Sequence, residues 1–268
     1  MLVAEGHETF EATKENGFDL SMRNWSSLIP KKPFDYVIHL AQSAYYRDFP
    51  DGACDMMRIN LEATFELLEW NRKHCAGSFL FASTGTVYGQ KPYALTEKDV
   101  AAPSSFYGAT KLCAEHLIEQ YQAFFPTHIM RLFGVYGPGQ KSMVIINLIE
   151  KILRNKEIVL ANGIGLKFNP LFVEDCSRIL CGLIKSKSTH SNVLNVAGKE
   201  VVGLGEVVEK LGELLNVPPR VTITQDLETN LVANIEALED LFPAFEATAL
   251  DVGLGKTCKW VQDQKIFC

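Results

Sequence analysis

The sequence lacks any hydrophobic run long enough to cross a membrane, and no positively charged start is followed by an apolar segment. It also lacks runs of Lys and Arg, and its net charge of −6 argues against a general nucleic-acid-binding protein. Its 268 residues are 47% hydrophobic and 22% charged, as in ordinary globular proteins. We therefore expect a cytoplasmic protein of one large or two closely packed domains, with neither membrane nor nucleic acid as partner.

No Cys-x-x-Cys pair occurs, no internal repeat is visible, and the six histidines do not stand at metal-ligand spacing. The seven cysteines are scattered and odd in number, so we expect reduced thiols rather than a disulfide framework. They are Cys54, Cys75, Cys113, Cys176, Cys181, Cys258 and Cys268. We expect no structural or catalytic metal.

What the sequence does contain is an alternation of strand-like and helical runs. Predicted strands lie at Tyr36–Ala41, Phe79–Ser83 and His128–Phe133, and predicted helices at Met56–Lys73 and Tyr107–Phe124. Such alternation is typical of parallel βαβ units. Beyond Gly139 the pattern predicts helices over Met143–Arg154, Glu174–Ser186 and Val202–Leu215, and short strands at Ile158–Leu160 and Val193–Val196.

Tyr107 and Lys111 stand four residues apart on a predicted helix, so both side chains can point into one cleft. A nearby cation favours the phenolate and lowers a pKa that is near 10 in a free tyrosine. The tyrosine would then be a plausible proton shuttle at neutral pH. The turn after the strand Phe79–Ser83 adds Thr84, whose hydroxyl could bond both the tyrosine and a reacting oxygen.

Together these segments resemble the extended short-chain dehydrogenase/reductase family of nucleotide-sugar epimerases, dehydratases and reductases. The resemblance runs along nearly the whole chain. Its landmarks are Ser83–Gly89, Ser105–Lys111, Asp35–Ala41, Arg58–Thr64, Arg131–Gly139, Leu171–Asp175 and Gly253–Trp260. It implies an α/β fold, with a Rossmann-like parallel sheet, flanking helices and a small C-terminal substrate-binding lobe. By this resemblance the cofactor domain covers residues 1–138 and the substrate lobe most of 139–268, with segments returning to the sheet near 170–200.

The resemblance also implies roles for individual residues. Tyr107 would be the catalytic acid/base, Lys111 would hold the cofactor ribose, and Thr84 would be the catalytic hydroxyl, with Ser83 as its immediate alternative. The cofactor would be NAD or NADP. Its predicted contacts are Asp19 and Leu20 beside the adenine, Ala41, Asn60 and Ser83 along the channel, and Tyr107 and Lys111 at the nicotinamide ribose.

On the substrate side, the two positions after Thr84 are Gly85 and Thr86, where dehydratases of the family carry an acidic pair. Dehydration and decarboxylation are therefore unexpected, whereas epimerisation and keto-sugar reduction remain open. The substrate would be a nucleotide sugar, with Thr86, Gly134, Lys167 and Asn169 as candidate contacts. Family members carry an arginine near Phe168 that grips the diphosphate, and none stands there in this sequence. A homodimer through the helices Met56–Lys73 and Tyr107–Phe124 is expected by analogy.

The glycine-rich turn that cradles a dinucleotide pyrophosphate does not occur near the start of the sequence. Met1–Phe10 resembles the end of the family's first helix and the start of its second strand. Alternatively, Met1–Ala4 is a stunted first strand and Glu8–Asn16 a helix. Three hypotheses stay open: an active NAD(P)-dependent epimerase or reductase, an impaired or non-enzymatic relative, and a shortened product of an active enzyme. Without the turn, we expect weak dinucleotide binding.

Overall fold

The computed structural model describes residues 1–74, 77–186 and 190–264, so Cys75 and Cys268 lie outside the described residues. The chain forms two compact units. The first comprises Met1–Gly89, Glu97–Arg131 and Leu180–Leu194, and the second comprises Gln90–Thr96, Leu132–Ile179 and Asn195–Cys268. The chain therefore passes between the units several times. The predicted domain boundary at residue 138 stays a prediction.

The first unit is built on a four-stranded sheet. Its order is β1 (Tyr36–His39), β2 (Ser78–Thr84), β3 (Thr127–Leu132) and β8 (Asn192–Val196). Strands β1 and β2 run parallel, with Tyr36 opposite Ser78 and His39 opposite Phe81. All seven residues of β2 are buried, because a parallel strand covered on both faces has no solvent side. The predicted Rossmann-like sheet with flanking helices is confirmed.

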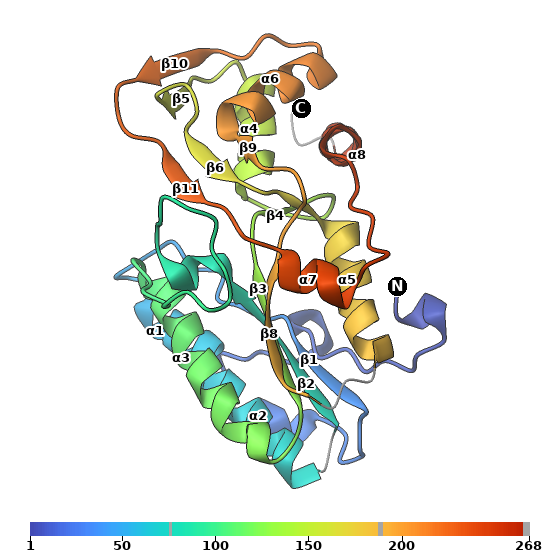
Figure 1. The fold of residues 1–268 in the computed structure, drawn as a ribbon. Coiled ribbons are helices and arrows are strands. Elements are labelled where there is room, and N and C mark those ends of the chain that lie inside the picture. Colours follow the sequence, from blue (N-terminus) through green and yellow to red (C-terminus); the bar gives the residue numbers. More distant parts are fainter. Residues whose placement is uncertain (75–76, 187–189, 265–268) are drawn as a thin grey trace. The chain divides into compact units, whose positions relative to one another are not determined.

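Helices α2 (Ala63–His74) and α3 (Phe106–Gln120) lie side by side along one face of this sheet (Figure 1). Their buried apolar residues pack against the sheet; this core consists of Leu68, Phe79, Phe81, Ala114, Ile118, Phe125 and Ile129. Helix α3 begins where Ser105 adopts an extended backbone and its hydroxyl accepts a hydrogen bond from the amide of Gly108 at 3.1 Å. Serine is a preferred residue at this capping position.

The predicted helix Met56–Lys73 is continuous but not uniformly α-helical. It starts with α1 (Ala53–Met56), continues as a π-helical segment over Met57–Glu62, and only then becomes α2. Single π-helical turns inside α-helices are rare and occur frequently at functional sites. The side chain of Asn60, in the middle of this segment, is completely buried.

The first 35 residues form short 3₁₀ turns at Val3–Glu5, Lys14–Asn16 and Trp25–Leu28, and no strand. Both predictions for this segment are therefore wrong: the start of a second strand within Met1–Phe10, and the alternative of a strand at Met1–Ala4 with a helix at Glu8–Asn16. Gly6 and Gly17 adopt left-handed backbone angles (φ 86° and 87°) and end the first two turns. The segment is held by side chains instead, as Phe18, Trp25 and Ile29 pack with Ala63 and Trp70 of α2.

The second unit contains short strands and five helices or parts of helices. The strands pair as β4 (Val135–Tyr136) with β7 (Leu171–Phe172), as β5 (Ile158–Ala161) with β10 (Val221–Thr224), and as β11 (Thr229–Leu231), β6 (Leu166–Phe168) and β9 (Val202–Gly203). The helices are α4 (Val144–Leu153), the start of α5 (Val173–Ser186), α6 (Leu204–Leu215), α7 (Glu236–Leu241) and α8 (Leu250–Asp263). Apolar faces of α4, α6 and α8 form its core.

The predicted helix Val202–Leu215 starts two residues later than expected. Val202 and Gly203 belong to β9 and pair with Phe168 and Lys167 of β6. Gly203 has an extended backbone, and its amide donates to the carboxylate of Glu206 at 3.1 Å. This contact satisfies an amide that the first helical turn leaves without a partner, so the helix begins at Leu204.

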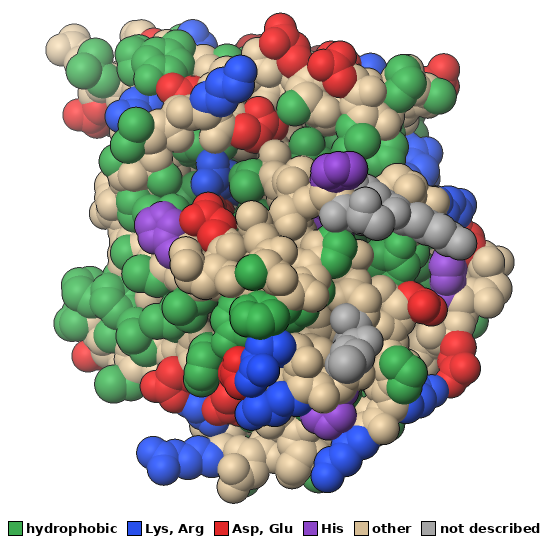
Figure 2. Space-filling view, turned by 60° about the horizontal axis from the view of Figure 1, so that its bottom comes forward, with side chains coloured by type: hydrophobic (Ala, Val, Ile, Leu, Met, Phe, Trp, Pro, Cys, Tyr) green, Lys and Arg blue, Asp and Glu red, His purple; other side chains and the backbone are tan. Residues whose placement is uncertain are grey.

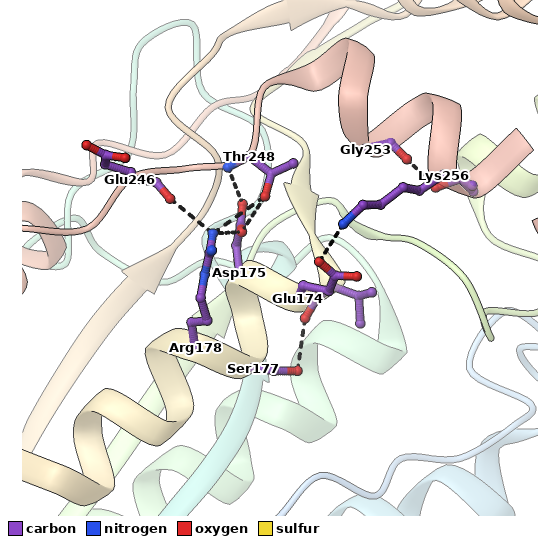
Figure 3. A network of polar contacts seen from close by, with 10 residues as sticks. Glu174, Asp175, Ser177, Arg178, Glu246, Thr248, Gly253 and Lys256 are labelled. Carbon is purple, nitrogen blue, oxygen red and sulfur yellow. Dashed lines mark hydrogen bonds and ion pairs between the residues drawn. The ribbon is translucent and has the colours of Figure 1, made fainter. Parts of the chain in front are cut away.

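A polar network joins α5 to the start of α8 (Figure 3). The carboxylate of Asp175, which is 1% exposed, accepts hydrogen bonds from the amide of Thr248 at 2.8 Å and from its hydroxyl at 2.7 Å, and pairs with Arg178. Lys256 pairs with Glu174 at 2.8 Å. The segment Leu171–Asp175, a landmark of the family resemblance, thus ends in two carboxylates that bind Thr248 and Lys256 within the second unit.

Candidate functional site

The carboxyl end of β2 brings Thr84 to the first turn of α3, within the first unit. Thr84 is the last residue of the strand and caps the 3₁₀ turn Gly85–Tyr88. Its Oγ1 accepts a hydrogen bond from the amide of Thr86 at 3.2 Å and lies 3.1 Å from the Thr86 Oγ1. The two hydroxyls are therefore held together at the end of a buried strand.

Tyr107 lies in the first turn of α3, beside Thr84. Its hydroxyl donates a hydrogen bond to Oε1 of Gln42 at 2.8 Å, and its ring centroid is 5.3 Å from that of Tyr46. Burial raises the pKa of Tyr107 to about 12, and a hydrogen bond with Thr84 opposes that change. The phenol is consequently protonated at neutral pH in this structure, and it holds its proton more tightly than a free tyrosine does.

Lys111 is one turn further along α3, and its side chain is almost completely buried. Its Nζ donates a hydrogen bond to the carbonyl oxygen of Ala82 at 2.8 Å and lies 4.5 Å from the ring centroid of Phe81. Burial lowers the pKa of Lys111 to about 7, while Glu115 acts in the opposite direction. The ammonium thus braces β2 next to Thr84.

The prediction that Lys111 lowers the pKa of Tyr107 is wrong for this structure. The ammonium is turned toward the backbone of β2, and burial of the phenol is the largest influence on Tyr107. Burial disfavours the charged form of each group, so it raises the pKa of a phenol and lowers that of an ammonium. Both side chains are accordingly biased toward their neutral forms.

A buried ion pair lies directly under the Ser83–Thr84 end of β2. The guanidinium of Arg131 binds the carboxylate of Glu115 through Nε and Nη2, the shortest contact being 2.6 Å, and its Nη1 donates to the hydroxyl of Tyr88 at 2.7 Å. The hydroxyl of Ser83 donates to the same carboxylate. Buried charges require such partners, and here they fix the strand end and the following turn.

This network decides between the two candidate hydroxyls. Ser83 is directed into the interior toward Glu115, whereas Thr84 meets Thr86 and Tyr107. Of the two hydroxyls, Thr84 is therefore the one that lies beside Tyr107. Ser83, predicted also as a cofactor contact, has its hydroxyl engaged in the core.

Asn60 and Ala41 are predicted to line the cofactor channel. Asn60 lies on the π-helical segment, and Ala41 follows the carboxyl end of β1. The amide group of Asn60 is fully used within the protein, because Oδ1 accepts from the backbone of Ser43 at 2.9 Å and Nδ2 donates to Thr110 at 3.0 Å. Ala41 is partly exposed in the loop after β1. Asn60 thus connects this loop to α3.

Asp19 and Leu20, predicted beside the adenine, lie in the N-terminal segment. The carboxylate of Asp19 accepts hydrogen bonds from the backbone and hydroxyl of Ser21, and pairs with Lys14 at 3.2 Å. The bonds from Ser21, aided by Lys14, lower the pKa of Asp19 to about 2. Leu20 packs against the aromatic cluster around Trp25 and Trp70.

The remaining substrate candidates, Gly134, Lys167 and Asn169, belong to the second unit. Asn169 is buried and pairs with the backbone of Ala233 through both ends of its amide, at 3.0 Å each. Gly134 has φ 53°, and an added Cβ would lie 2.8 Å from the ring of Phe168. Lys167 is exposed on β6. Of the three, Lys167 is the one that presents a charged group at the surface of this unit.

The first unit fits one end of a dinucleotide. Tyr107 and Lys111 place hydrogen-bond donors at the carboxyl ends of parallel strands, where such folds bind nucleotides. Lys111 gives one of its N–H groups to Ala82, which leaves further donors for a ribose. The glycines of residues 1–52 stand singly at 6, 17 and 52, so none of these residues forms a glycine-rich pyrophosphate turn.

In residues 1–74, 77–186 and 190–264, no three His, Cys, Asp or Glu side chains come together as a metal site. The five described cysteines are free thiols. The helices of these same residues include none that is long and apolar enough to span a membrane.

Three features of the site were not predicted from the sequence: Gln42, the pair Glu115–Arg131, and the double role of Asn60. A signal for Glu115 does exist, because Tyr107, Lys111 and Glu115 are spaced by four and share one face of α3. Arg131 stands at the start of the landmark Arg131–Gly139, and nothing in that segment indicates Glu115 as its partner. Gln42 has no local signal, since its contact with Tyr107 joins residues 65 positions apart.

Comparison with known proteins gives the following matches. The model of a family described as the NAD dependent epimerase/dehydratase family matches residues 4–197. The uncharacterized UDP-glucose epimerase YtcB of Bacillus subtilis (strain 168) is 27% identical over 267 residues, which cover 88% of this chain and 83% of YtcB. The GDP-6-deoxy-D-mannose reductase of Pseudomonas aeruginosa is 31% identical over 211 residues, covering 74% of this chain and 68% of the reductase.

Solved structures agree. MoeE5 in complex with UDP-glucose and NAD superimposes with a TM-score of 0.78 at 27% identity, covering 92% of this chain and 84% of MoeE5. The UDP-glucuronic acid 4-epimerase of Bacillus cereus, in complex with UDP-glucuronic acid and NAD, gives a TM-score of 0.82 at 25% identity, with 92% and 80% covered.

Proposed function

Because this chain belongs to the NAD dependent epimerase/dehydratase family, we propose that it is an NAD(P)-dependent nucleotide-sugar epimerase or keto-sugar reductase, with Tyr107 as its acid/base. One observation carries the proposal. The hydroxyls of Thr84 and Tyr107 meet at the carboxyl end of β2, and Lys111 is buried one helical turn away. A hydroxyl pair beside a buried ammonium suits proton transfer to or from a sugar hydroxyl.

The residues would share the work as follows. When bound, a nicotinamide dinucleotide supplies the hydride chemistry. Thr84 would hydrogen-bond the reacting sugar oxygen and orient it toward Tyr107. The phenol of Tyr107 would give its proton to that oxygen in reduction, and a tyrosinate would accept the proton in oxidation. Lys111 and Tyr107 would hold the ribose.

The turn after Thr84 narrows the reaction class. Gly85 and Thr86 carry no carboxylate. The Oγ1 atom of Thr86 instead lies 3.1 Å from the Oγ1 atom of Thr84. Elimination of water needs a group that removes a carbon-bound proton, and a hydroxyl with an ordinary pKa is a poor base for that step. Epimerisation and reduction need only the Thr84–Tyr107 pair from the protein.

The substrate class rests on the neighbours, which bind UDP-glucose and UDP-glucuronic acid. Thr86, Gly134, Lys167 and Asn169 remain the candidate contacts for this chain. Lys167 suits a diphosphate because it is an exposed cation. Asn169 would contribute by shaping the backbone, since its amide is committed to Ala233.

An assay with UDP-sugars tests the proposal directly. UDP-glucose, UDP-glucuronic acid and GDP-linked 4-keto sugars are incubated with the protein and each of NAD⁺, NADH, NADP⁺ and NADPH. We expect either an epimer formed without net cofactor change or a reduced sugar formed with stoichiometric cofactor oxidation. Failure of every pairing, with a folded protein, would contradict the proposal.

A second candidate, an impaired or non-enzymatic relative, is favoured by a specific observation. The glycines of residues 1–52 are isolated, and the Asp19 carboxylate is bound to Ser21 and Lys14. Both features weaken the contacts available to the adenine and the pyrophosphate. Calorimetric titration with the four dinucleotides separates the candidates, because stoichiometric binding of any of them favours the enzyme.

We also propose that the protein is a homodimer. Met57 on the π-helical segment and Phe65 on α2 are apolar side chains that are 38% and 47% exposed. Figure 2 shows hydrophobic side chains gathered on the left of the face drawn, the side on which α1 and α3 lie in Figure 1. An exposed apolar face on paired helices suits a second copy of itself. Light scattering is expected to give twice the chain mass, and a monomer mass at micromolar concentration would contradict this.

A further inference from the structure

The loop of residues 40–52, between β1 and α1, has a conformation fixed at several points. The backbone of Ser43 donates to Asn60 at 2.9 Å, and its hydroxyl donates to the carboxylate of Asp55. The ring of Phe49 stacks on that of Phe106 with centroids 4.9 Å apart. At Gly52, an added Cβ would lie 2.7 Å from the backbone oxygen of Tyr45, so only glycine fits. The loop is therefore held in place at Ser43, Phe49 and Gly52.

The same anchors connect this loop to the turn of α3 that carries Tyr107. Asn60 binds Ser43 with its Oδ1 and Thr110 with its Nδ2, and the hydroxyl of Thr110 donates to the carbonyl of Tyr107 at 2.8 Å. Because all of these groups belong to the first unit, the loop and the tyrosine form one hydrogen-bonded assembly. The position of Gln42, next to Ser43, is thereby set relative to the phenol.

The side chain of Gln42 is exposed, and its Oε1 accepts a hydrogen bond from the phenol oxygen of Tyr107 at 2.8 Å. A hydrogen bond of this length directs the phenol proton toward the amide. A tyrosine that exchanges a proton with substrate must release that bond or reverse it. The contact thus bears directly on the atom that the proposed reaction uses.

We propose that Gln42 is a positioning residue for Tyr107, with an amide that accepts a hydrogen bond from the phenol and turns over to donate one to the phenolate. This inference rests on the proposed role of Tyr107. A glutamine suits the task because its amide carries an acceptor oxygen and a donor NH₂ on one torsion with two broad, nearly equivalent orientations. Neither a carboxylate nor an apolar side chain could serve both protonation states.

The proposed rotation of the Gln42 amide gives the phenolate of Tyr107 a hydrogen-bond donor, which Lys111 does not provide. The Lys111 ammonium is bound to Ala82, and burial biases Tyr107 toward the neutral phenol. A donor to the phenolate would partly offset that burial, because hydrogen bonds to charged groups are stronger than those between neutral groups. Gln42 is placed to be that donor once its amide has rotated.

Other titratable and charged groups lie on the loop of Gln42, on α3 and on the neighbouring elements, and they must be kept unchanged in any test. They are Tyr46, Arg47 and Asp48 on the loop, Asp55 on α1, His39 on β1, Tyr88 on the turn after β2, and Lys111 and Glu115 on α3. None of them is altered by a substitution at Gln42.

The test measures the ionisation of Tyr107 itself. Protein labelled with 3-fluorotyrosine, which ionises at lower pH than tyrosine, is titrated by ¹⁹F NMR, and the Tyr107 signal is assigned as the one lost in Tyr107→Phe. Gln42→Met, which can neither donate nor accept, is expected to raise the pKa of that signal by about one unit. Gln42→Glu, which adds a negative charge, is expected to raise it by about two units. Gln262→Glu, an exposed change on α8, is the matched control and should leave it unchanged.

The outcomes separate this inference from the proposed function. An ordered rise from wild type through Gln42→Met to Gln42→Glu, together with the same shift in the alkaline limb of the rate profile, supports both. The ordered rise in a protein that turns over no sugar supports the inference and contradicts the proposed function. An unchanged Tyr107 signal in both variants overturns the inference, whether or not the protein is active. Because Gln42 is exposed, both variants should fold.

Discussion

Replacing Tyr107 with phenylalanine is expected to lower turnover of any sugar substrate by about 10²–10⁴-fold, the usual contribution of a positioned acid/base. The hydroxyl is the only group lost, and the ring stays in place. Its hydrogen-bond partners Gln42 and Thr84 are both provided for, because Gln42 is exposed to water and Thr84 still bonds with Thr86. The free energy of unfolding should therefore change by less than about 1 kcal/mol. Steady-state kinetics and a denaturation curve on the same preparation measure both quantities.

A matched control for this variant is Tyr93→Phe, which makes the same chemical change at an exposed tyrosine of the second unit. It should keep wild-type turnover. If Tyr107→Phe behaves like the control, Tyr107 has no part in the chemistry, and the assignment of Thr84 as its partner loses its basis as well.

The second large effect concerns the pH dependence of stability. Burial lowers the pKa of Lys111 to about 7 in the folded protein, whereas an unfolded lysine titrates near 10.4. Between these values the unfolded chain binds more protons than the folded one, so the free energy of unfolding rises with pH. The rise is expected to approach about 1.4 kcal/mol per pH unit. Below pH 7 the burial penalty of the ammonium is fully present.

Other titratable groups limit the pH range in which the effect of Lys111 on stability can be measured. Burial lowers the pKa of His39 to about 3, so its own contribution rises only between there and its ordinary value of 6.5. Burial raises the pKa of the Cys176 and Cys258 thiols to about 11, from an ordinary value of 9, which lowers stability as pH increases above 9. The interval from pH 7 to pH 9 therefore reports mainly on Lys111.

Urea denaturation at several pH values in this interval tests the prediction. Wild-type protein should gain about 2–3 kcal/mol of unfolding free energy from pH 7 to pH 9. Lys111→Met removes the titrating group and should flatten the dependence, whereas Lys156→Met, at an exposed position, should not. A wild-type curve that is flat over this interval would mean that the ammonium is better solvated than its burial implies.

The features of the fold that the sequence predicts are those set by interactions between residues close together in the chain. The strands around Phe79-Leu80-Phe81 and the helix starting after Ser105 were predicted correctly, because hydrophobic runs and capping residues act locally. The N-terminal segment was predicted wrongly. There, Phe18 and Trp25 pack onto α2, and this distant contact outweighs the local preference for a strand or helix.

At the candidate site, the pattern of Thr84, Tyr107 and Lys111 was visible in the sequence, but its electrostatics was not. Four-residue spacing places Tyr107 and Lys111 on one helix face, yet the pKa of each depends on how deeply it is buried and on what it contacts. Those contacts include Ala82 and Gln42, which belong to other elements. No pattern within a single segment encodes them.

The π-helical segment Met57–Glu62 has a consequence for how this helix can change during evolution. One additional residue is accommodated in a π turn relative to an α turn, so the two flanking helices are offset by roughly a hundred degrees of rotation. Deleting a single residue here would restore regular geometry at little local cost. The deletion would also rotate every side chain on one side of it about the helix axis. Asn60 would then lose its contact with either Ser43 or Thr110. Length variation in this stretch should therefore be far less tolerated than substitution at its exposed positions.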